Sequence, residues 1–216
     1  MTYKESLLLT GDKWTTLSDE QKIEVLQNIE NHSAYESGRL SCPVVGRFLY
    51  TGNDGVVLGS YDPNTKNIYI NTSQFDSESK YGGSSEALVT TCLHEGRHAY
   101  QHQVVNGSVK CEDEAIAAIW KDNLSDGNYI SYKENPRAYY NQPVEVDARK
   151  FAEVKYKELL EERDEYLEAT NQSEDAKCVF EQQMNDSEFE TEHQAASYES
   201  SDDYSILVSS DNKYSF

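Results

Sequence analysis

Two histidines four residues apart, with a glutamate directly after the first, lie near the middle of this 216-residue chain. The segment reads His94-Glu95-Gly96-Arg97-His98. Side chains four residues apart share one face of an α-helix, so both imidazoles can bind one metal ion. The neighbouring glutamate can then hold a metal-bound water and accept its proton. This is the HExxH pattern, and it predicts a hydrolytic centre with one Zn²⁺ per chain.

The motif resembles that of the HExxH zinc metallopeptidases, the zincins, and the resemblance covers roughly the middle half of the chain. A metzincin would continue the motif with Gly and His, but Gln101 and Val104 occupy those positions. In the gluzincin branch a glutamate on a later helix completes the ligand set. The pattern Glu-x-x-Ala-x-x-Phe-Ala at 145–152 is similar to that helix in small gluzincins. The resemblance therefore implies Glu145 as the third ligand, although a helix dipole would also favour a carboxylate there.

Two other residues near these positions are weaker candidates for the third ligand. His102 is eight residues from His94, about 12 Å along a helix axis, which is too far for one ion with bonds near 2.1 Å. Asp147 points some 200° away from Glu145 on a helix. Two roles stay open for Asp147: orienting a ligand imidazole by accepting its N–H, or a salt bridge with a nearby arginine.

The resemblance also implies a group that stabilises the negative charge developing on the substrate carbonyl. Gluzincins often use a tyrosine or histidine beyond the motif helix, so Tyr139 and Tyr140 are the candidates. With 16 tyrosines in the chain, simple packing is the alternative for either. Zincins bind substrate as an extra strand on a sheet edge, which the resemblance assigns to 68–71 or the strand beside it.

The elements that must position these residues can be read from the chain upstream of the motif. Ser18 and Gln21 form a capping-box pattern, and the helix that they open should fade near Gly38. Strands are expected at 42–50 and 56–75, broken by turn sequences at 51–55 and 62–67. These turns predict antiparallel hairpins.

Three more helices are expected around and beyond the motif. The motif helix should span 86–105, a shorter helix 112–121, and a long helix 143–168 with Pro143 in its first turn. Residues 123–142 are expected to form a loop. The predicted fold is α+β and zincin-like, with a small antiparallel or mixed sheet packed on the motif helix and a second ligand-bearing helix.

The chain divides by composition into a metallopeptidase-like domain at 1–170 and an acidic tail at 171–216. The tail is rich in Ser, Asp, Glu, Asn and Gln without sustained apolar periodicity, so it should be poorly ordered or loosely docked. Over the whole chain, 19 basic and 39 acidic side chains give a net charge of -20. Charge of that sign argues against nucleic acid and favours a protein or peptide substrate, a basic one above all.

Location and redox state follow from what the sequence lacks. There is neither an apolar run long enough to cross a membrane nor a signal-peptide pattern at the N-terminus. The four scattered cysteines favour free thiols. The chain is expected in the cytoplasm, or exported without a classical signal peptide as an effector or toxin domain.

These observations predict a zinc-dependent metallopeptidase in which Glu95 activates water for peptide-bond hydrolysis. The first alternative is a zincin-fold toxin, effector or regulatory binding module whose main role is not general proteolysis. The second is a metal-free acidic interaction protein with an accidental motif. An intact Glu95 argues against a module without hydrolysis, because binding alone has no need of that side chain.

Overall fold

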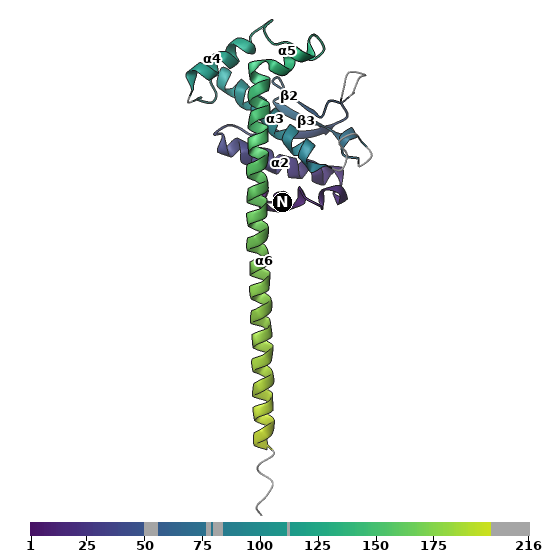
Figure 1. Cartoon of the computed structure of the whole chain (residues 1–216), viewed down its shortest axis with the longest axis vertical. Helices are drawn as coiled ribbons and strands as arrows, with labels where there is room; N and C mark the ends of the chain where they lie inside the picture. The colour runs from purple at the N-terminus through teal and green to yellow at the C-terminus, as the bar shows by residue number, and fades with distance from the viewer. Residues whose placement is uncertain (50–55, 77–78, 80–83, 112, 200–216) are drawn as a thin grey trace, which may run out of the picture. The chain divides into compact units, whose positions relative to one another are not determined.

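The structure is a computed structural model, and it describes residues 1–49, 56–76, 79, 84–111 and 113–199, with side chains up to residue 171 (Figure 1). The chain divides into two compact units, Met1–Leu167 and Glu168–Phe216. The domain boundary expected at residue 170 and the loose docking of the tail stay predictions.

The fold of the first unit is mixed α+β. Its elements, in chain order, are α1 (Tyr3–Leu9), the 3-10 turn η1 (Trp14–Thr16), α2 (Asp19–Glu36), β1 (Val44–Arg47), β2 (Gly59–Asp62), β3 (Asn67–Asn71), η2 (Thr72–Gln74), α3 (Ser85–Val105), α4 (Glu114–Asn123), α5 (Pro136–Asn141) and the start of α6 (Pro143–Glu199). Among the helices that the structure describes, none combines the length and hydrophobicity needed to cross a bilayer.

Local signals in the sequence place most helix starts correctly. The Ser18 side chain accepts a hydrogen bond from the Gln21 N–H, and the Gln21 side chain accepts one from the Ser18 N–H. The predicted capping box therefore opens α2. Pro143 stands at the start of α6 as expected. Two helices, α1 and α5, were not predicted from the sequence. Both are too short for apolar periodicity, and they depend on caps by Thr2 and Asn135.

The later helices differ from expectation mainly in length. The helix expected at 112–121 is α4, shifted two residues downstream, and residue 112 lies outside the described part of the chain. The helix expected to end near residue 168 continues as α6 to Glu199. The backbone of residues 171–199, expected to be poorly ordered or loosely docked, is helical, while 200–216 lie outside the described residues.

The three-stranded sheet is mixed, with the order β1-β3-β2. β2 and β3 form the expected antiparallel hairpin, in which Ser60 pairs with Tyr69. The prediction of a hairpin involving β1 is wrong, because β1 pairs parallel to β3, with Val45 opposite Tyr69. The turn sequence at 51–55 suggested that hairpin, and it lies outside the described residues. Among the described strands β3 is central, so the expectation that 68–71 forms a sheet edge is wrong, and its neighbours β1 and β2 form the edges.

The core lies between α2, the sheet and α3. Its buried apolar side chains include Val25, Leu26, Ile29, Val44, Ile68, Ile70, Leu88, Val89, Cys92, Leu93, Ala152 and Leu159. Gly59 lets β2 approach α3 closely, because a Cβ there would lie 2.6 Å from Thr91 Cγ2 and 2.9 Å from the Tyr69 carbonyl oxygen. The motif helix is thus held by the sheet on one side and by α2 on another.

A buried ion pair lies where α2 meets the motif helix. Arg39 donates to both carboxylate oxygens of Glu30 at 2.6 Å, and each side chain is 1% exposed. The N–H of Cys42 also donates to Glu30, at 2.9 Å. A Cβ at Gly96 would lie 2.7 Å from Glu30 Oε2 and 2.8 Å from Arg39 Nη2. Glycine inside the motif is therefore required by the ion pair behind it.

The three cysteines whose side chains the structure describes, Cys42, Cys92 and Cys111, are free thiols, as their spacing predicted. Burial, together with the charge of Glu30, raises the pKa of Cys42 to about 11. Burial raises the pKa of Cys92 as well. These two thiols therefore stay protonated and serve as packing residues.

We expect Gly96→Ala to destabilise the protein. Alanine gains about 1 kcal/mol of helix propensity, but overpacking against a fixed ion pair costs roughly 1–3 kcal/mol. The melting temperature should fall by about 2–4 °C for each kcal/mol of net loss. Gly11→Ala is the control, because its Cβ would meet only Arg163 Nη1 at 3.8 Å. A melting temperature of Gly96→Ala at or above that of the parent would contradict this account.

Candidate metal centre

The two motif histidines and Glu145 converge on one point. His94 Nε2 lies 3.0 Å from His98 Nε2. Glu145 Oε2 lies 3.2 Å from His94 Nε2, and Glu145 Oε1 lies 3.4 Å from His98 Nε2. The two histidines come from one face of α3, and the glutamate comes from the first turn of α6. These three residues form one of the groups in the described chain whose ligand atoms could hold a metal ion.

The spacing of these atoms fits a tetrahedral metal site. Bonds of about 2.0–2.1 Å at tetrahedral angles place neighbouring ligand atoms about 3.3 Å apart. The distances of 3.0, 3.2 and 3.4 Å lie near that value, with Oε2 of Glu145 facing His94 and Oε1 facing His98. The side chains of His94 and His98 are 17% and 13% exposed, and that of Glu145 is 2% exposed. Two imidazoles and one carboxylate leave a fourth position for water, as catalytic zinc requires.

The electrostatics of the site are dominated by the contact between Glu145 and the imidazoles. Burial alone would lower the pKa of His98, but its hydrogen bond to Glu145 and the charges of Glu95 and Glu145 raise that pKa to about 9. For Glu145, burial opposes ionisation, yet the hydrogen bonds from His94 and His98 hold its pKa well below the usual range. A positive charge at this point, whether proton or metal, is therefore strongly favoured.

The start of α6 is fixed by side chains from the preceding segment. Asn123 Oδ1 accepts the Val144 N–H at 3.2 Å, and Asn123 Nδ2 donates to Gln142 Oε1 at 3.2 Å. The Gln142 carboxamide also exchanges two hydrogen bonds with the main chain of Ile130. These bonds hold the loop after α4 against the first turn of α6, where Glu145 points to the histidines.

Tyr129, which no sequence pattern singled out, lies at the site, in the segment expected to be a loop. Its hydroxyl donates to Glu145 Oε1 at 3.0 Å. Burial, followed by the charge of Glu145, raises the pKa of Tyr129. Nothing in its sequence neighbourhood marks Tyr129 among 16 tyrosines, because its position depends on the Gln142 contacts just described.

The two tyrosines proposed from sequence lie in different surroundings. Tyr139 is half-buried beside Tyr129, with ring centroids 6.3 Å apart, and burial followed by the charge of Glu145 raises its pKa. Tyr140 is 57% exposed, and the Arg149 guanidinium lies over its ring at 3.6 Å. The structure therefore brings Tyr139 to the site and turns Tyr140 towards Arg149.

Asp147 is separated from the ligand imidazoles by Gln101. Arg97 donates to Asp147 through Nε at 2.8 Å and Nη2 at 3.1 Å. Gln101 Nε2 donates to Asp147 Oδ2 at 2.7 Å, while Gln101 Oε1 lies 2.9 Å from His98 Nδ1. Of the two roles left open for Asp147, the arginine salt bridge is present, and Gln101 is the residue that meets the imidazole.

Glu95 is buried and held by the sheet. The main-chain N–H of Tyr61, on β2, donates to Glu95 Oε2 at 2.7 Å. His102, the rejected third ligand, lies one turn beyond His98 with its ring 5.5 Å from that of Tyr61. Burial lowers the pKa of His102, and the charge of His98 adds to this effect. His102 is thus a neighbour of the site rather than a member of the ligand triangle.

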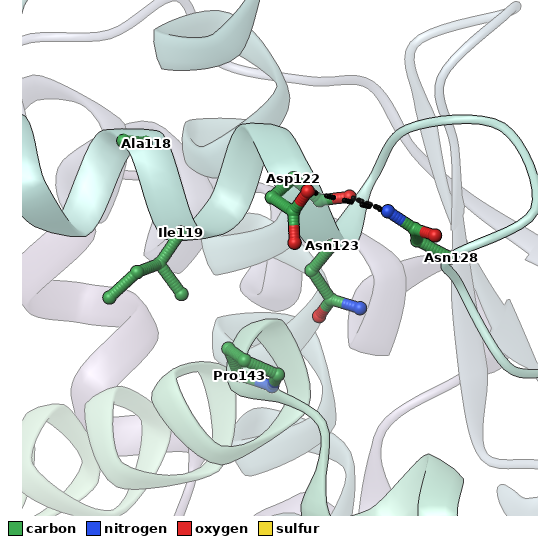
Figure 2. A pocket seen from close by; sticks show the side chains of 6 residues that line it. All are labelled: Ala118, Ile119, Asp122, Asn123, Asn128 and Pro143. Atoms are coloured by element: carbon green, nitrogen blue, oxygen red, sulfur yellow. Dashed lines mark hydrogen bonds between the residues drawn. The ribbon is translucent and has the colours of Figure 1, made fainter.

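Two other features of the described chain differ from this centre. His32, Glu36 and Glu162 also lie within metal-binding distance of one another, but Lys155 Nζ lies 3.2 Å from Glu36 Oε2 and already supplies a positive charge. Figure 2 shows an open surface hollow beside α4. It is lined by Ala118, Ile119, Asp122, Asn123, Asn128 and Pro143, none of which belongs to the ligand triangle.

Comparisons of the chain with protein-family models, with curated proteins and with solved structures found no match. Function is therefore inferred from the geometry of the site. That geometry joins His94, His98 and Glu145, residues separated by up to 51 positions (145 minus 94), around one point.

We expect Glu145→Ala to weaken zinc binding by orders of magnitude while the helix content stays constant. Only two histidines would then remain to hold the ion. Asp147→Asn should cost about 10-fold, because its carboxylate acts on the site through Gln101. Competition with a chelator measures both dissociation constants. If Asp147→Asn releases zinc and Glu145→Ala retains it, the assignment of ligands on α6 is wrong.

The metal-free protein should lose stability as the pH rises from about 6.5 to 9. The folded pKa of His98 is raised to about 9, so its contribution is complete below the unfolded pKa near 6.5 and disappears as pH passes through 9. The lost contribution is roughly 3 kcal/mol. Urea unfolding in the presence of a chelator measures it, with His98→Asn as the reference. Equal pH dependence in both proteins would refute the coupling.

Proposed function

We propose that the chain is a zinc-dependent metallopeptidase of the small gluzincin type. The observation that carries this proposal is the triangle of His94, His98 and Glu145, with ligand atoms 3.0–3.4 Å apart. Zinc suits this donor set, since two imidazoles and a carboxylate with an open fourth position are typical of hydrolytic zinc sites. The small sheet against the motif helix is compatible with a zincin-like fold.

Zinc held by these side chains would act as a Lewis acid and would lower the pKa of a water molecule towards neutrality. The task of this chain's own Glu95 is to move protons. One of its oxygens accepts the Tyr61 N–H, which fixes the carboxylate, and we assign Oε1 to proton transfer. Glu95 takes a proton from the attacking water and returns it to the amine nitrogen that leaves the cleaved bond.

The substrate in this proposal is an extended peptide that adds to β2. In the antiparallel pairing of β2 and β3, the Asn71 N–H donates to the Leu58 carbonyl. The alternation of such pairs turns the main-chain groups of Ser60 towards β3 and those of Gly59 and Tyr61 outwards. The outer edge of β2 therefore lies beside Glu95, which already accepts the Tyr61 N–H, so the peptide would pair with the main chain of Gly59 and the carbonyl of Tyr61. The net charge of -20 favours a basic peptide.

Tyr139 is our candidate for stabilising charge on the carbonyl oxygen. It lies half-buried next to Tyr129 and Glu145, and its raised pKa keeps the hydroxyl protonated as a hydrogen-bond donor. Tyr129 already donates to Glu145 in this structure, which favours a supporting role for it. Tyr140 is withdrawn as a candidate, since Arg149 covers its ring.

Glu95→Gln should fold, retain zinc and lose peptide hydrolysis. Glutamine has the same shape but cannot accept a proton, so the rate should fall by roughly 10²–10⁴-fold. Quenched fluorescent peptide libraries of basic and acidic composition would report hydrolysis, and elemental analysis would report zinc. Glu86→Gln, an exposed glutamate on the same helix, is the matched control. Unchanged cleavage by Glu95→Gln would remove this residue from the mechanism.

A further inference from the structure

Gln101 is the most completely buried polar residue beside the metal triangle. It lies on α3 one turn after His98 and is 0% exposed. Its carboxamide makes three contacts: Oε1 lies 2.9 Å from His98 Nδ1, and Nε2 donates to the Val144 carbonyl at 3.0 Å and to Asp147 Oδ2 at 2.7 Å. The buried carboxamide of Gln101 therefore links α3 to α6 by hydrogen bonds.

The orientation of this carboxamide is dictated by its partners. A carbonyl oxygen and a carboxylate oxygen can only accept, so the Gln101 amino group must face Val144 and Asp147. Turning the carboxamide over would place its oxygen against two acceptors and take this donor away from the carbonyl of the buried residue Val144, while Asp147 would keep only its bonds from Arg97. Gln101 Oε1 is therefore fixed towards His98.

The fixed oxygen determines which nitrogen of His98 faces the metal triangle. Gln101 Oε1 can only accept, so His98 Nδ1 must carry a proton. In the neutral imidazole, Nε2 then holds the lone pair, and Nε2 is the atom that lies 3.0–3.4 Å from His94 and Glu145. Metal binding requires this tautomer.

The same carboxamide also fixes the rotation of α6. Its two acceptors, the Val144 carbonyl and the Asp147 carboxylate, flank Glu145 in the first turns of that helix. Arg97 strengthens this contact with its two bonds to Asp147. The guanidinium of Arg97 is held in turn by three aromatic rings at 4.6–5.1 Å, which are those of Tyr100, Trp120 and Phe151.

We propose that Gln101 is the positioning residue of the metal centre. Anchored by Asp147 and Arg97, it sets the metal-binding tautomer of His98 and the rotation of α6 that directs Glu145 to the ion. This proposal rests on the proposed function, since it takes the triangle to be a zinc site. It assigns to position 101 a role that neither the HExxH motif nor the third-ligand helix contains.

The first test is Gln101→Met, which keeps the length of the side chain and removes all three polar contacts. We expect zinc affinity to fall by roughly 10–100-fold. The visible absorption spectrum of the cobalt-substituted protein should also change, because the imidazole is no longer held. Gln103→Met is the matched control. Gln103 lies on the same helix as Gln101 and exchanges two hydrogen bonds with the Leu40 main chain. Its zinc affinity and cobalt spectrum should stay those of the parent.

The second test separates positioning from packing by rescue. Gln101→Glu keeps an acceptor for His98 but sets a second carboxylate against Asp147, so zinc affinity should fall. Adding Asp147→Asn restores an amide donor between these positions and an acceptor for Arg97. The double variant should therefore bind zinc more tightly than Gln101→Glu alone, although Asp147→Asn weakens binding in the parent. A purely structural role predicts no such reversal.

Chelator competition gives the dissociation constants, and thermal melting of the metal-free proteins gives their stability. Affinity loss in Gln101→Met together with rescue in the double variant supports the proposal. Parent-like affinity and spectrum in Gln101→Met, or a double variant no better than Gln101→Glu, overturns it. A parent protein that binds neither zinc nor cobalt overturns the proposed function instead, which keeps the two failures distinct.

Discussion

The site depends on holding two imidazole nitrogens and the carboxylate of Glu145 close together: His94 Nε2 lies 3.0 Å from His98 Nε2, and the two nitrogens lie 3.2 and 3.4 Å from different oxygens of Glu145. When His98 is neutral, its single N–H is directed to Gln101, so the lone pair of His98 Nε2 faces the carboxylate of Glu145. In the metal-free chain a proton on Nε2, favoured by the pKa of about 9, supplies a positive charge between these groups. A divalent cation would serve all three side chains at once. The surrounding fold holds these polar groups together, whereas in the unfolded chain they would separate and be hydrated.

That constraint explains why α3 is approached so closely by three different elements. Gly96 admits the Glu30–Arg39 pair on the α2 side, and Gly59 admits β2 on the sheet side. On α6, Ala148 and Ala152 are 0% and 1% exposed. The close contacts with α2 and β2 leave α3 little room to rotate, so its histidine face stays directed at Glu145.

Short-range signals in the sequence were sufficient to predict the motif helix and the face on which its two histidines lie. Ser18 with Gln21 predicted the start of α2, and Pro143 predicted the start of α6, because caps and first-turn prolines act within a few residues. The pattern around Glu145 depended on resemblance to other proteins, and the structure independently brings that side chain to the histidines.

The features that the sequence did not reveal are long-range. The parallel pairing of β1 with β3 joins segments more than 20 residues apart, so it cannot be predicted from local turn sequences. Tyr129 donates to Glu145, and its neighbour Ile130 is held in place by a hydrogen bond from the Gln142 side chain to the Ile130 carbonyl. Gln101 looked like the residue that excludes a metzincin, whereas in the structure it connects His98 to Asp147. Such roles are properties of contacts between helices, and composition carries no trace of them.

Apolar packing alone would not fix the rotation of α6 about its own axis. Successive residues on a helix differ by about 100°, so a turn by one position would present Val144 or Val146 to the histidines in place of Glu145. Alanine contacts such as that of Ala148 have little directional preference and would tolerate part of that rotation. Hydrogen bonds weaken steeply when their angles change, so the bonds from Gln101 and Arg97 resist it. The buried polar network therefore selects one register of α6, and that register is the one in which a carboxylate completes the triangle.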